Sequence, residues 1–364
     1  METKLMKKIV ITGPRQVEIQ EVPIPEPGEQ MLLVKTELSG VSAGTEMMLY
    51  RGNYPNFTEK KWPQWQEYPV MPGYELVGTV VAVGPGGAQD QGGGTQMDSL
   101  GPASSIIKTD VSEFKVGDRV ICMGEHAEYA LVPAVLAVKI PDHVTSEEAT
   151  LTVLATTALH GIHRAQIQYG DTVVVNGCGV LGYLTMQHAK RCGARRVVVI
   201  DMNDERLAVA KDTGADVVIN PGKVNVVEAL KAANDGILAD VVIEASGFPN
   251  ATQQAMELAR DRGRVVLLGW HTEGVHFAFG EFYFRELTVI ATQAIGPEAG
   301  LPYSYVRWPS DQGLKWSMQL IAEGKLTGKY FKPTRFRYDE IAKVYDMIDR
   351  RDPAVGLQTV LTWD

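Results

Sequence analysis

Two domains of the α/β class are predicted for this chain on three observations. Its 364 residues exceed what one hydrophobic core usually covers. Up to about residue 150, short apolar runs such as "KKIVITG" and "GTVVAVG" are separated by turn residues, which indicates a β-rich domain. From about 158 to 293, buried-strand runs such as "DTVVVNG" and "RRVVVID" alternate with segments of helix length, which indicates a parallel sheet wrapped by helices.

The rest of the chain adds smaller elements. After residue 296 we expect helices around 312–323 and 338–350 and a last strand in "GLQTVLTW". Residues 85–113 are so rich in Gly, Ser, Pro and Asp that we interpret them as a surface loop and expect no chemistry there. No run reaches the roughly 18 apolar residues of a membrane span, and the N-terminus lacks the apolar core of a signal peptide. A cytoplasmic location is expected.

Composition narrows the classes of partner. The three cysteines, Cys122, Cys178 and Cys192, include no pair at the two-residue spacing of a zinc knuckle, and their odd number suits no complete disulfide framework. A reduced compartment and the absence of structural zinc are therefore predicted. The formal charge of -9 and the scattered lysines and arginines give no electrostatic footprint for nucleic acid. The expected partner is a small molecule.

A dinucleotide site is predicted in "DTVVVNGCGVLGYLTMQHAKRCGARRVVVID". Gly177, Gly179 and Gly182 follow a strand and open a helix, where glycines permit a tight turn and let the backbone approach a pyrophosphate. Asp201 ends the next strand, where its carboxylate can accept both ribose hydroxyls and would repel a 2'-phosphate, so NAD is favoured over NADP. The alternatives are a glycine turn that only packs a helix, and an Asp201 that only caps "NDERLAVAK".

Several motifs together resemble a known family. "GVSAGTEMMLYRG", "MPGYELVGTVVAVG", "FKVGDRV", "EEATLTVLATTALHG", "DVVIEASG" and "GRVVLLG" occur in the order found in medium-chain dehydrogenases/reductases, the zinc alcohol dehydrogenase superfamily. The resemblance covers nearly the whole chain. It implies a GroES-like β-barrel catalytic domain in residues 1–157 and 295–364, a Rossmann NAD-binding domain with a doubly wound parallel sheet in 158–294, a substrate cleft between them, and a homodimer or homotetramer.

The same resemblance implies further residues of the NAD site. Beyond the three glycines and the acid, we expect the cofactor to contact Thr157, Val180, Leu181, Arg206, Ser246, Gly247, Gly269 and Trp270.

The resemblance also predicts that no metal is bound. Relatives with catalytic zinc carry Cys, His and often Glu or Cys at three positions that read here Ala43 (or Ser42, one residue earlier), Tyr74 and Thr152. These side chains are poor zinc ligands. The family's four-cysteine lobe is also absent, because "GDRVICMGEHAEYALVP" runs straight on.

Within the superfamily, one branch is the most similar. "GVSAGTE" and "LLGWHTEGVHFAFGEFYFRELTV" resemble the bacteriochlorophyllide dehydrogenase-like branch, many of whose members act on sugars, cyclitols or polyols. The resemblance therefore suggests a reaction type without naming a pigment as the substrate.

Without zinc, side chains must accept the alcohol proton and stabilise the alkoxide. Tyr74 stands where a metal ligand would stand, although as a base its phenol would need a pKa lowered by a cation or by NAD. Thr45 matches a hydroxyl that relays the proton in relatives, His271 is a rival base, and Glu75 is a supporting acid. The alternatives are a space-filling Tyr74, a turn threonine and an exposed loop histidine.

Substrate contacts are expected from aromatic and charged side chains near these groups. The candidates are Glu46, Arg51, Trp62, His126 and Trp308. Aromatic faces with a guanidinium suit a sugar-like ring or an acidic substituent, but they are also enriched in domain and subunit interfaces.

The predicted activity is NAD-dependent, zinc-independent interconversion of a secondary alcohol and a ketone, on a sugar, cyclitol or polyol. The alternatives are a zinc-free enone or quinone-type reductase and a non-catalytic dinucleotide-binding protein.

Overall fold

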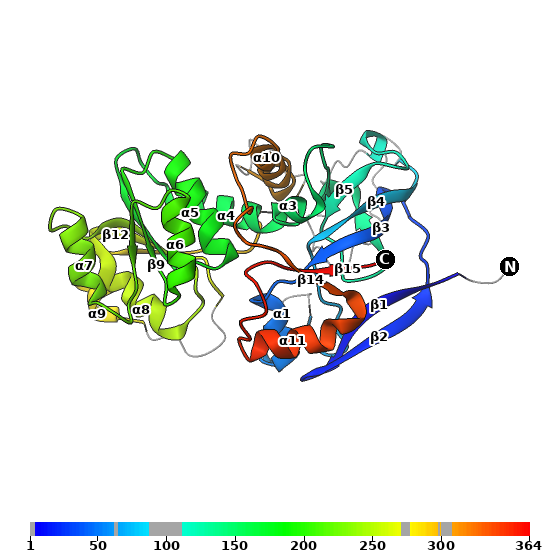
Figure 1. The fold of residues 1–364 in the computed structure, drawn as a ribbon, viewed down its shortest axis with the longest axis horizontal. Helices are drawn as coiled ribbons and strands as arrows, with labels where there is room; N and C mark the ends of the chain where they lie inside the picture. The colour runs from blue at the N-terminus through cyan, green and yellow to red at the C-terminus, as the bar shows by residue number, and fades with distance from the viewer. Residues whose placement is uncertain (1–3, 62–64, 87–110, 271–276, 298, 300–307) are drawn as a thin grey trace. The chain divides into compact units, whose positions relative to one another are not determined.

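The computed structural model describes residues 4–61, 65–86, 111–270, 277–297, 299 and 308–364. They form two compact units, one of Met1–Val153 with Pro297–Asp364 and one of Leu154–Gly296. Each unit has its own sheets (Figure 1). Each also has its own core of buried side chains. The units divide a few residues away from the points that the sequence suggested, 157/158 and 294/295.

Two sheets form the strand framework of the first unit. A two-stranded sheet pairs β1 with β2, and a seven-stranded sheet has the order β14-β15-β3-β4-β5-β7, with β6 paired to β3. Within the described residues no ladder joins β7 to β14, so the closed barrel stays a prediction. The strands are β1 (Leu5–Gly13), β2 (Gln16–Pro23), β3 (Met31–Gly40), β4 (Leu76–Val83), β5 (Arg119–Cys122), β6 (Tyr129–Pro133), β7 (Ala137–Lys139), β14 (Thr334–Arg337) and β15 (Thr359–Thr362).

The register of β3 against β4 brings two distant stretches together. The strands are antiparallel, and Ser39, next to the end of β3, pairs with Leu76, the first residue of β4. The chain that follows Gly40 and the chain that precedes Leu76 therefore leave the sheet at the same end. This end carries the turn 41–46 and the residues Tyr74 and Glu75.

Helices of the first unit cover its sheets and supply much of its core. Side chains of α1 and α11 pack with β1 in one buried cluster. The predicted helices near 312–323 and 338–350 are confirmed as α10 and α11, and the last strand as β15. The helical elements are α1 (Thr45–Arg51), α2 (Asn56–Glu59), η2 (Val111–Glu113), η3 (Ala134–Leu136), α3 (Ser146–Thr150), α10 (Ser310–Ala322), η4 (Tyr338–Glu340) and α11 (Ile341–Asp349).

The second unit is a parallel sheet with helices, as the alternating runs predicted. Its six strands have the order β10-β9-β8-β11-β12-β13, and the order reverses between β8 and β11. Helix α4 (Thr152–Ala165) begins at the boundary between the units. The other elements are β8 (Thr172–Asn176), α5 (Val180–Arg191), β9 (Arg196–Ile200), α6 (Asp204–Asp212), β10 (Val217–Ile219), α7 (Val226–Ala233), β11 (Ala239–Glu244), α8 (Pro249–Leu258), β12 (Ala259–Leu267), α9 (Phe279–Phe284) and β13 (Thr288–Ala291).

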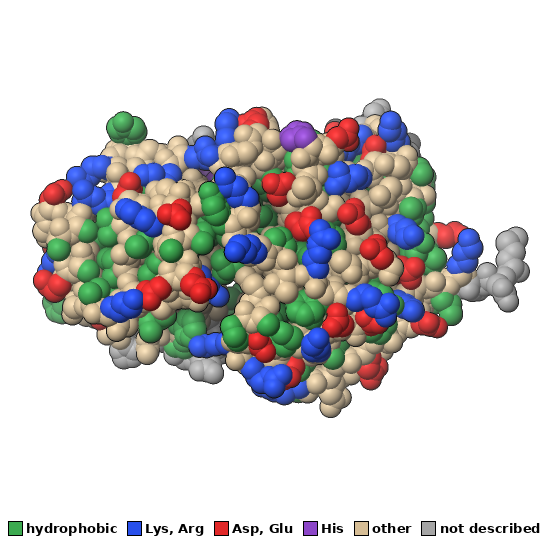
Figure 2. Space-filling model, in the orientation of Figure 1, with side chains coloured by type: hydrophobic (Ala, Val, Ile, Leu, Met, Phe, Trp, Pro, Cys, Tyr) green, Lys and Arg blue, Asp and Glu red, His purple; other side chains and the backbone are tan. Residues whose placement is uncertain are grey.

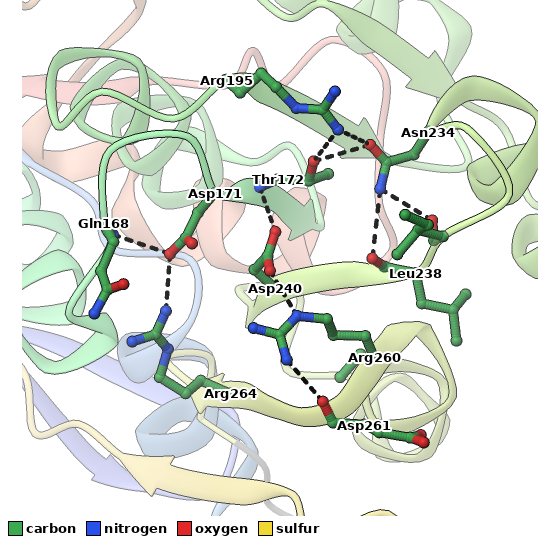
Figure 3. Close-up of polar contacts among 12 residues, drawn as sticks. Gln168, Asp171, Thr172, Arg195, Asn234, Leu238, Asp240, Arg260, Asp261 and Arg264 are labelled. Carbon is green, nitrogen blue, oxygen red and sulfur yellow. Dashed lines mark hydrogen bonds and ion pairs between the residues drawn. The ribbon is translucent and has the colours of Figure 1, made fainter.

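Ion pairs hold together the edge of this sheet at which the strands begin (Figure 3). Asp240 of β11 accepts from the backbone N–H of Thr172 at 2.8 Å and pairs with Arg260 of β12 at 2.6 Å. Arg264 of β12 pairs with Asp171, which precedes β8, at 2.8 Å. Side chains thus join the starts of three strands here, and the opposite, carboxyl edge is where open parallel sheets bind ligands.

Two surface properties bear on the class of partner. On the face drawn in Figure 2, lysine and arginine side chains are interspersed with aspartate and glutamate and do not gather into one basic patch. None of the helices in the described part of the chain is long and apolar enough to cross a membrane.

Candidate functional site

The glycine loop after β8 has the close contacts that require glycine. Gly177 has a φ of 100°, and a Cβ there would lie 2.8 Å from the backbone of Ser246. A Cβ at Gly182 would overlap the carbonyl oxygen of Gly177. Gly179 caps the N-terminus of α5, whose first N–H groups have no partner within the helix. The loop therefore presents backbone donors at the carboxyl edge of the sheet.

Asp201, after β9, lies directly against this loop. Its Oδ2 accepts from the backbone N–H of Cys178 at 2.7 Å and its Oδ1 from that of Asn203 at 2.8 Å. The cap of α6 is a different residue, because the Asn203 side chain accepts from the backbone N–H of Arg206. The carboxylate therefore places negative charge beside the glycine loop and leaves the capping of α6 to its neighbour.

A second acid organises the same edge, and the sequence did not single it out. Glu244 ends β11, is fully buried, and accepts from the backbone N–H groups of Ser246 at 2.7 Å and Gly247 at 3.1 Å. A Cβ at Gly269 would lie 2.8 Å from Glu244 Oε2. The signal for this residue was an acid at the end of a fully buried strand.

The predicted NAD residues divide by their positions. Those at the carboxyl edge of the sheet or in the first turn of α5 form one group: Gly177, Gly179, Val180, Leu181, Gly182, Asp201, Ser246, Gly247 and Gly269. Thr157 lies on α4 and Arg206 on α6. Trp270, just beyond the group, is 48% exposed.

In the first unit, three hydroxyl groups meet at the edge of the sheet where β3 ends and β4 begins. The phenol of Tyr74 is hydrogen-bonded to Ser42 Oγ, and it donates to Thr45 Oγ1 at 3.4 Å. Burial raises the pKa of Tyr74, and the nearby Glu75 raises it further. The surroundings therefore favour a phenol that stays protonated and donates, whereas a base at neutral pH would need the opposite shift. Sequence reasoning had named Ser42 only as an alternative position for a lost ligand.

Glu75 is a buried acid beside this group. Burial, with a smaller contribution from Glu46, raises the pKa of Glu75 well above its usual range. Its Oε1 is buried and has no hydrogen-bond partner among the described residues. The side chain lies against Gly40, where a Cβ would be 2.5 Å from Glu75 Oε2. A buried acid with a raised pKa, whose Oε1 has no partner among the described residues, therefore directly follows Tyr74 in the sequence.

Glu46 and His126, which we expected to contact substrate, are bonded to each other in the core. Both are fully buried, and His126 Nε2 lies 3.1 Å from Glu46 Oε2. Glu46 also accepts from the backbone N–H of Ser42 at 2.8 Å and from the hydroxyl of Tyr345 at 2.6 Å. Because both side chains are fully buried, neither has exposed surface for a substrate contact. Their link to the three hydroxyls runs through the bond between Glu46 and Ser42.

The remaining predicted site residues lie elsewhere. Arg51 is at the end of α1 and pairs with Asp349 of α11 at 2.6 Å, which commits its guanidinium to a contact within the unit. Trp308 is partly buried, with its ring 6.5 Å from that of Trp316. Trp62 and His271 lie outside the described residues.

The three positions at which the resemblance predicts lost zinc ligands hold side chains with other contacts. Ala43 has no donor atom, Tyr74 is engaged with two hydroxyl groups, and buried Thr152 donates to the carbonyl of Ala149 at 2.7 Å. Over the described ranges, no three His, Cys, Asp or Glu side chains are grouped closely enough to hold a metal ion. Tetrahedral zinc takes thiolate, imidazole or carboxylate ligands.

Two sequence families match this chain. An alcohol dehydrogenase GroES-like domain matches residues 28–142, and a zinc-binding dehydrogenase domain matches residues 180–300. The chain is 28% identical over 363 residues to an erythritol/L-threitol dehydrogenase of Mycolicibacterium smegmatis, covering 94% of each chain. It is 32% identical over 300 residues to an L-threonine 3-dehydrogenase of Pyrococcus furiosus, covering 78% of this chain and 82% of the relative.

Solved structures share the fold. One is an alcohol dehydrogenase (rspB) of Escherichia coli CFT073, complexed with the cofactor NADH; it is 24% identical, has a TM-score of 0.75, and is matched over 99% of this chain and 100% of its own. At this identity the likeness supports the α/β fold, with its GroES-like and Rossmann-like parts.

Proposed function

Because this chain belongs to the zinc-type medium-chain dehydrogenase/reductase superfamily, we propose that it is an NAD-dependent, zinc-independent oxidoreductase. It interconverts a secondary alcohol and a ketone, with a sugar, cyclitol or polyol as the substrate. The observation that carries this proposal is the group of hydroxyls, Tyr74, Ser42 and Thr45, at the position where zinc relatives keep metal ligands.

The cofactor is NAD, held by the second unit. The loop of Gly177, Gly179 and Gly182 offers backbone donors to a pyrophosphate, and the negative charge of Asp201 beside it favours free ribose hydroxyls over a 2'-phosphate. Structural neighbours include both an NADH complex and an NADP complex, so the preference for NAD rests on Asp201. When bound, NAD supplies or accepts the hydride.

The first unit handles the proton. In the reductive direction, Tyr74 donates its proton to the carbonyl oxygen of the substrate as hydride reaches the carbon. Ser42 and Thr45, which can each accept one proton and give another, resupply the phenol. In the oxidative direction the substrate hydroxyl gives its proton to Tyr74 as the phenol gives its own to Thr45, which is partly exposed and passes a proton to water. A phenol whose pKa is raised by burial stays protonated, and it gives up its proton once hydride has turned the substrate oxygen into an alkoxide, which is the stronger base.

Zinc independence rests on the donor set at positions 43, 74 and 152. A methyl group, an engaged phenol and a threonine hydroxyl bonded to a backbone carbonyl are not zinc ligands. Glu46, which could orient a ligand in a zinc enzyme, is hydrogen-bonded here to Ser42, His126 and Tyr345.

The substrate class is proposed from one relative and from two motifs. The relative, matched over 94% of each chain, is an erythritol/L-threitol dehydrogenase, and "GVSAGTE" and "LLGWHTEGVHFAFGEFYFRELTV" resemble the bacteriochlorophyllide dehydrogenase-like branch. A polyhydroxylated ring or chain satisfies both.

A second activity is favoured by one observation. An enone or quinone-type reductase needs hydride delivery and a donor for the developing oxyanion, and a protonated Tyr74 would serve as that donor. Asp201 argues against it, because zinc-free reductases of this superfamily usually favour NADPH.

The assembly is proposed to be a homodimer or homotetramer. Three aromatic side chains of α9, Phe279, Tyr283 and Phe284, are each more than 60% exposed, and such residues are enriched in interfaces. A monomer in analytical ultracentrifugation would contradict this.

Turnover assays test the activity. Purified protein is incubated with NAD or NADP and a panel of erythritol, threitol, other polyols and cyclitols, and in parallel with NADH or NADPH and a panel of enones and quinones. We expect NAD reduction with at least one polyol or cyclitol. Activity on the enone and quinone panel alone would favour the reductase, and activity on neither panel would favour a non-catalytic dinucleotide-binding protein.

A further inference from the structure

The three hydroxyls of Tyr74, Ser42 and Thr45 are connected to a chain of buried, hydrogen-bonded polar side chains. Ser42 carries one of the hydroxyls, and its backbone N–H donates to Glu46 Oε1 at 2.8 Å, while the backbone N–H of Glu46 donates to the Ser42 carbonyl at 3.0 Å. These two bonds fix the turn that presents both Ser42 Oγ and Thr45 Oγ1 to Tyr74. The position of the turn therefore depends on the position of the Glu46 carboxylate.

The hydrogen bonds of this chain can be followed from the Trp363 indole, through Ser39 and His126, to the Glu46 carboxylate. The Trp363 indole N–H, which can only donate, lies 2.9 Å from Ser39 Oγ. The other partner of Ser39 Oγ is His126 Nδ1 at 2.8 Å, and the assignment that pairs the buried Ser39 proton has it donated to Nδ1, which puts the ring hydrogen on Nε2. That hydrogen is then donated to Glu46 Oε2, which also accepts from Tyr345. In this arrangement every partner of Glu46 is a donor, and the carboxylate oxygens serve as acceptors.

Two members of this chain come from the C-terminal part of the sequence. Tyr345 lies on α11, 299 residues from Glu46, and Trp363 lies after β15, 324 residues from Ser39. Both are buried, and the ring of Tyr345 also packs 5.3 Å from that of Tyr50 on α1. Packing thus fixes the ring of Tyr345, and its hydroxyl donates a hydrogen bond to Glu46.

We propose that Tyr345 is a positioning residue for the reaction: through Glu46 it holds the turn that aligns Ser42 and Thr45 with Tyr74, and His126 gives Glu46 its second side-chain donor. A buried carboxylate that loses a donor is left under-solvated, because no water replaces the bond. It then moves toward its remaining donors, and the bond to the backbone of Ser42 is weakened. The catalytic meaning of this inference rests on the role of Tyr74 proposed above.

Tyrosine NMR tests the inference without a substrate. The protein is labelled with ¹³C at the Cζ of its tyrosines, and the Tyr74 signal is identified by its loss in Tyr74→Phe. Tyr345→Phe keeps the ring and removes the donor, so we expect the Tyr74 signal to move. Tyr68→Phe is the matched control, because it removes a hydroxyl bonded at 2.6 Å to the Leu49 carbonyl of the same helix without touching Glu46. A Tyr74 signal that stays in place in Tyr345→Phe, or moves equally in Tyr68→Phe, overturns the proposal.

His126 provides an independent route if Tyr345→Phe fails to fold. His126→Gln can place an amide N–H near the former Nε2, whereas His126→Leu cannot donate. We expect the Tyr74 signal to stay close to its wild-type position in the glutamine variant and to move in the leucine variant. The same shift in both variants, or a shift in neither, contradicts the proposal.

Turnover separates this inference from the proposed function. We expect Tyr345→Phe to lower kcat by about three- to tenfold, with unchanged NAD affinity. In the Tyr74→Phe background the same change should have no further effect. Suppose that Tyr74→Phe loses activity and that Tyr345→Phe lowers kcat by the same factor in this background as in the wild type. The positioning role is then rejected, while the proposed function stands. Full activity of Tyr74→Phe rejects the proposed function, while the NMR result still decides whether Tyr345 positions Tyr74.

Discussion

The glycine loop of the second unit and the cluster of three hydroxyls around Tyr74 in the first unit are built in different ways. Around the glycine loop, Asp201 and Glu244 accept mainly from backbone N–H groups a few to about two dozen residues away. Around Tyr74, the buried Glu46 accepts from the side chains of His126 and Tyr345 as well as from its neighbour Ser42. The first region is a local device of consecutive strands and helices, whereas the second needs the whole first unit to be folded.

This difference predicts that each region can be damaged without the other. Changes at Tyr74 should alter turnover and spare the dinucleotide, and changes at Asp201 should alter the choice of dinucleotide and spare the proton chemistry.

The largest effect is expected from Tyr74→Phe. The ring volume is kept, so the fold and NAD affinity should survive, while the hydroxyl that donates to the substrate oxygen is lost. Positioned acid–base groups contribute about 10²- to 10⁴-fold, so kcat should fall by that factor. Steady-state kinetics with the substrate found in the panel measures the fall in kcat. Calorimetry with NAD checks that the cofactor affinity is unchanged.

His271→Ala is the rival variant, chosen from the sequence. Near-wild-type turnover in Tyr74→Phe together with a large loss in His271→Ala would make the tyrosine a space-filling residue and the histidine the catalytic group.

A smaller effect is expected at the glycine loop. Asp201→Ser removes the charge beside the loop, so the preference for NAD over NADP should narrow or reverse by about ten- to a hundredfold, the scale of a few kcal/mol for two charges near a surface. The ratio of dissociation constants for the two cofactors measures this. Equal affinity of the wild-type protein for both cofactors would contradict the role of Asp201.

The buried acid next to Tyr74 gives a pH-dependent effect on stability. Because the pKa of Glu75 is raised, the folded chain keeps a proton that the unfolded chain loses above about pH 4.5. Stability from this group is therefore present at low pH and is lost as pH rises from that point through the folded pKa, by at most about 1.4 kcal/mol per pH unit.

Urea unfolding at about pH 5 and about pH 8 checks this effect. Glu75→Gln cannot ionise, so its stability relative to the wild type should rise with pH. The matched control is Glu29→Gln, at an exposed glutamate, where the difference from the wild type should not change with pH. Parallel stability curves for Glu75→Gln and the wild type would show that Glu75 ionises normally.

The sequence predicted the local region well and the other one in part. The strand runs of the second unit, the glycine turn and Asp201 can be recognised because their contacts lie within consecutive strands and helices. The residues that meet at Tyr74 were partly recognised, since Thr45 occurs in the motif that follows β3 and Tyr74 in the motif that precedes β4.

The groups behind Tyr74 could not be read in the same way. Nothing in the sequence near Tyr345 or Trp363 indicates a partner some 300 residues away, because such contacts are set by how α11 and β15 pack on the unit. For the same reason Glu46 and His126 were expected at the substrate: their side chains suit binding, and only packing shows that they are buried.

The central claim is that hydroxyl groups do at Tyr74 what a metal does in zinc relatives. The most direct measurement is the zinc content of the purified protein together with its turnover before and after dialysis against a chelator. The account predicts less than one zinc per chain and unchanged turnover after dialysis, because positions 43, 74 and 152 offer no suitable ligands. One tightly bound zinc per chain, with activity lost on its removal and restored on its return, would contradict it.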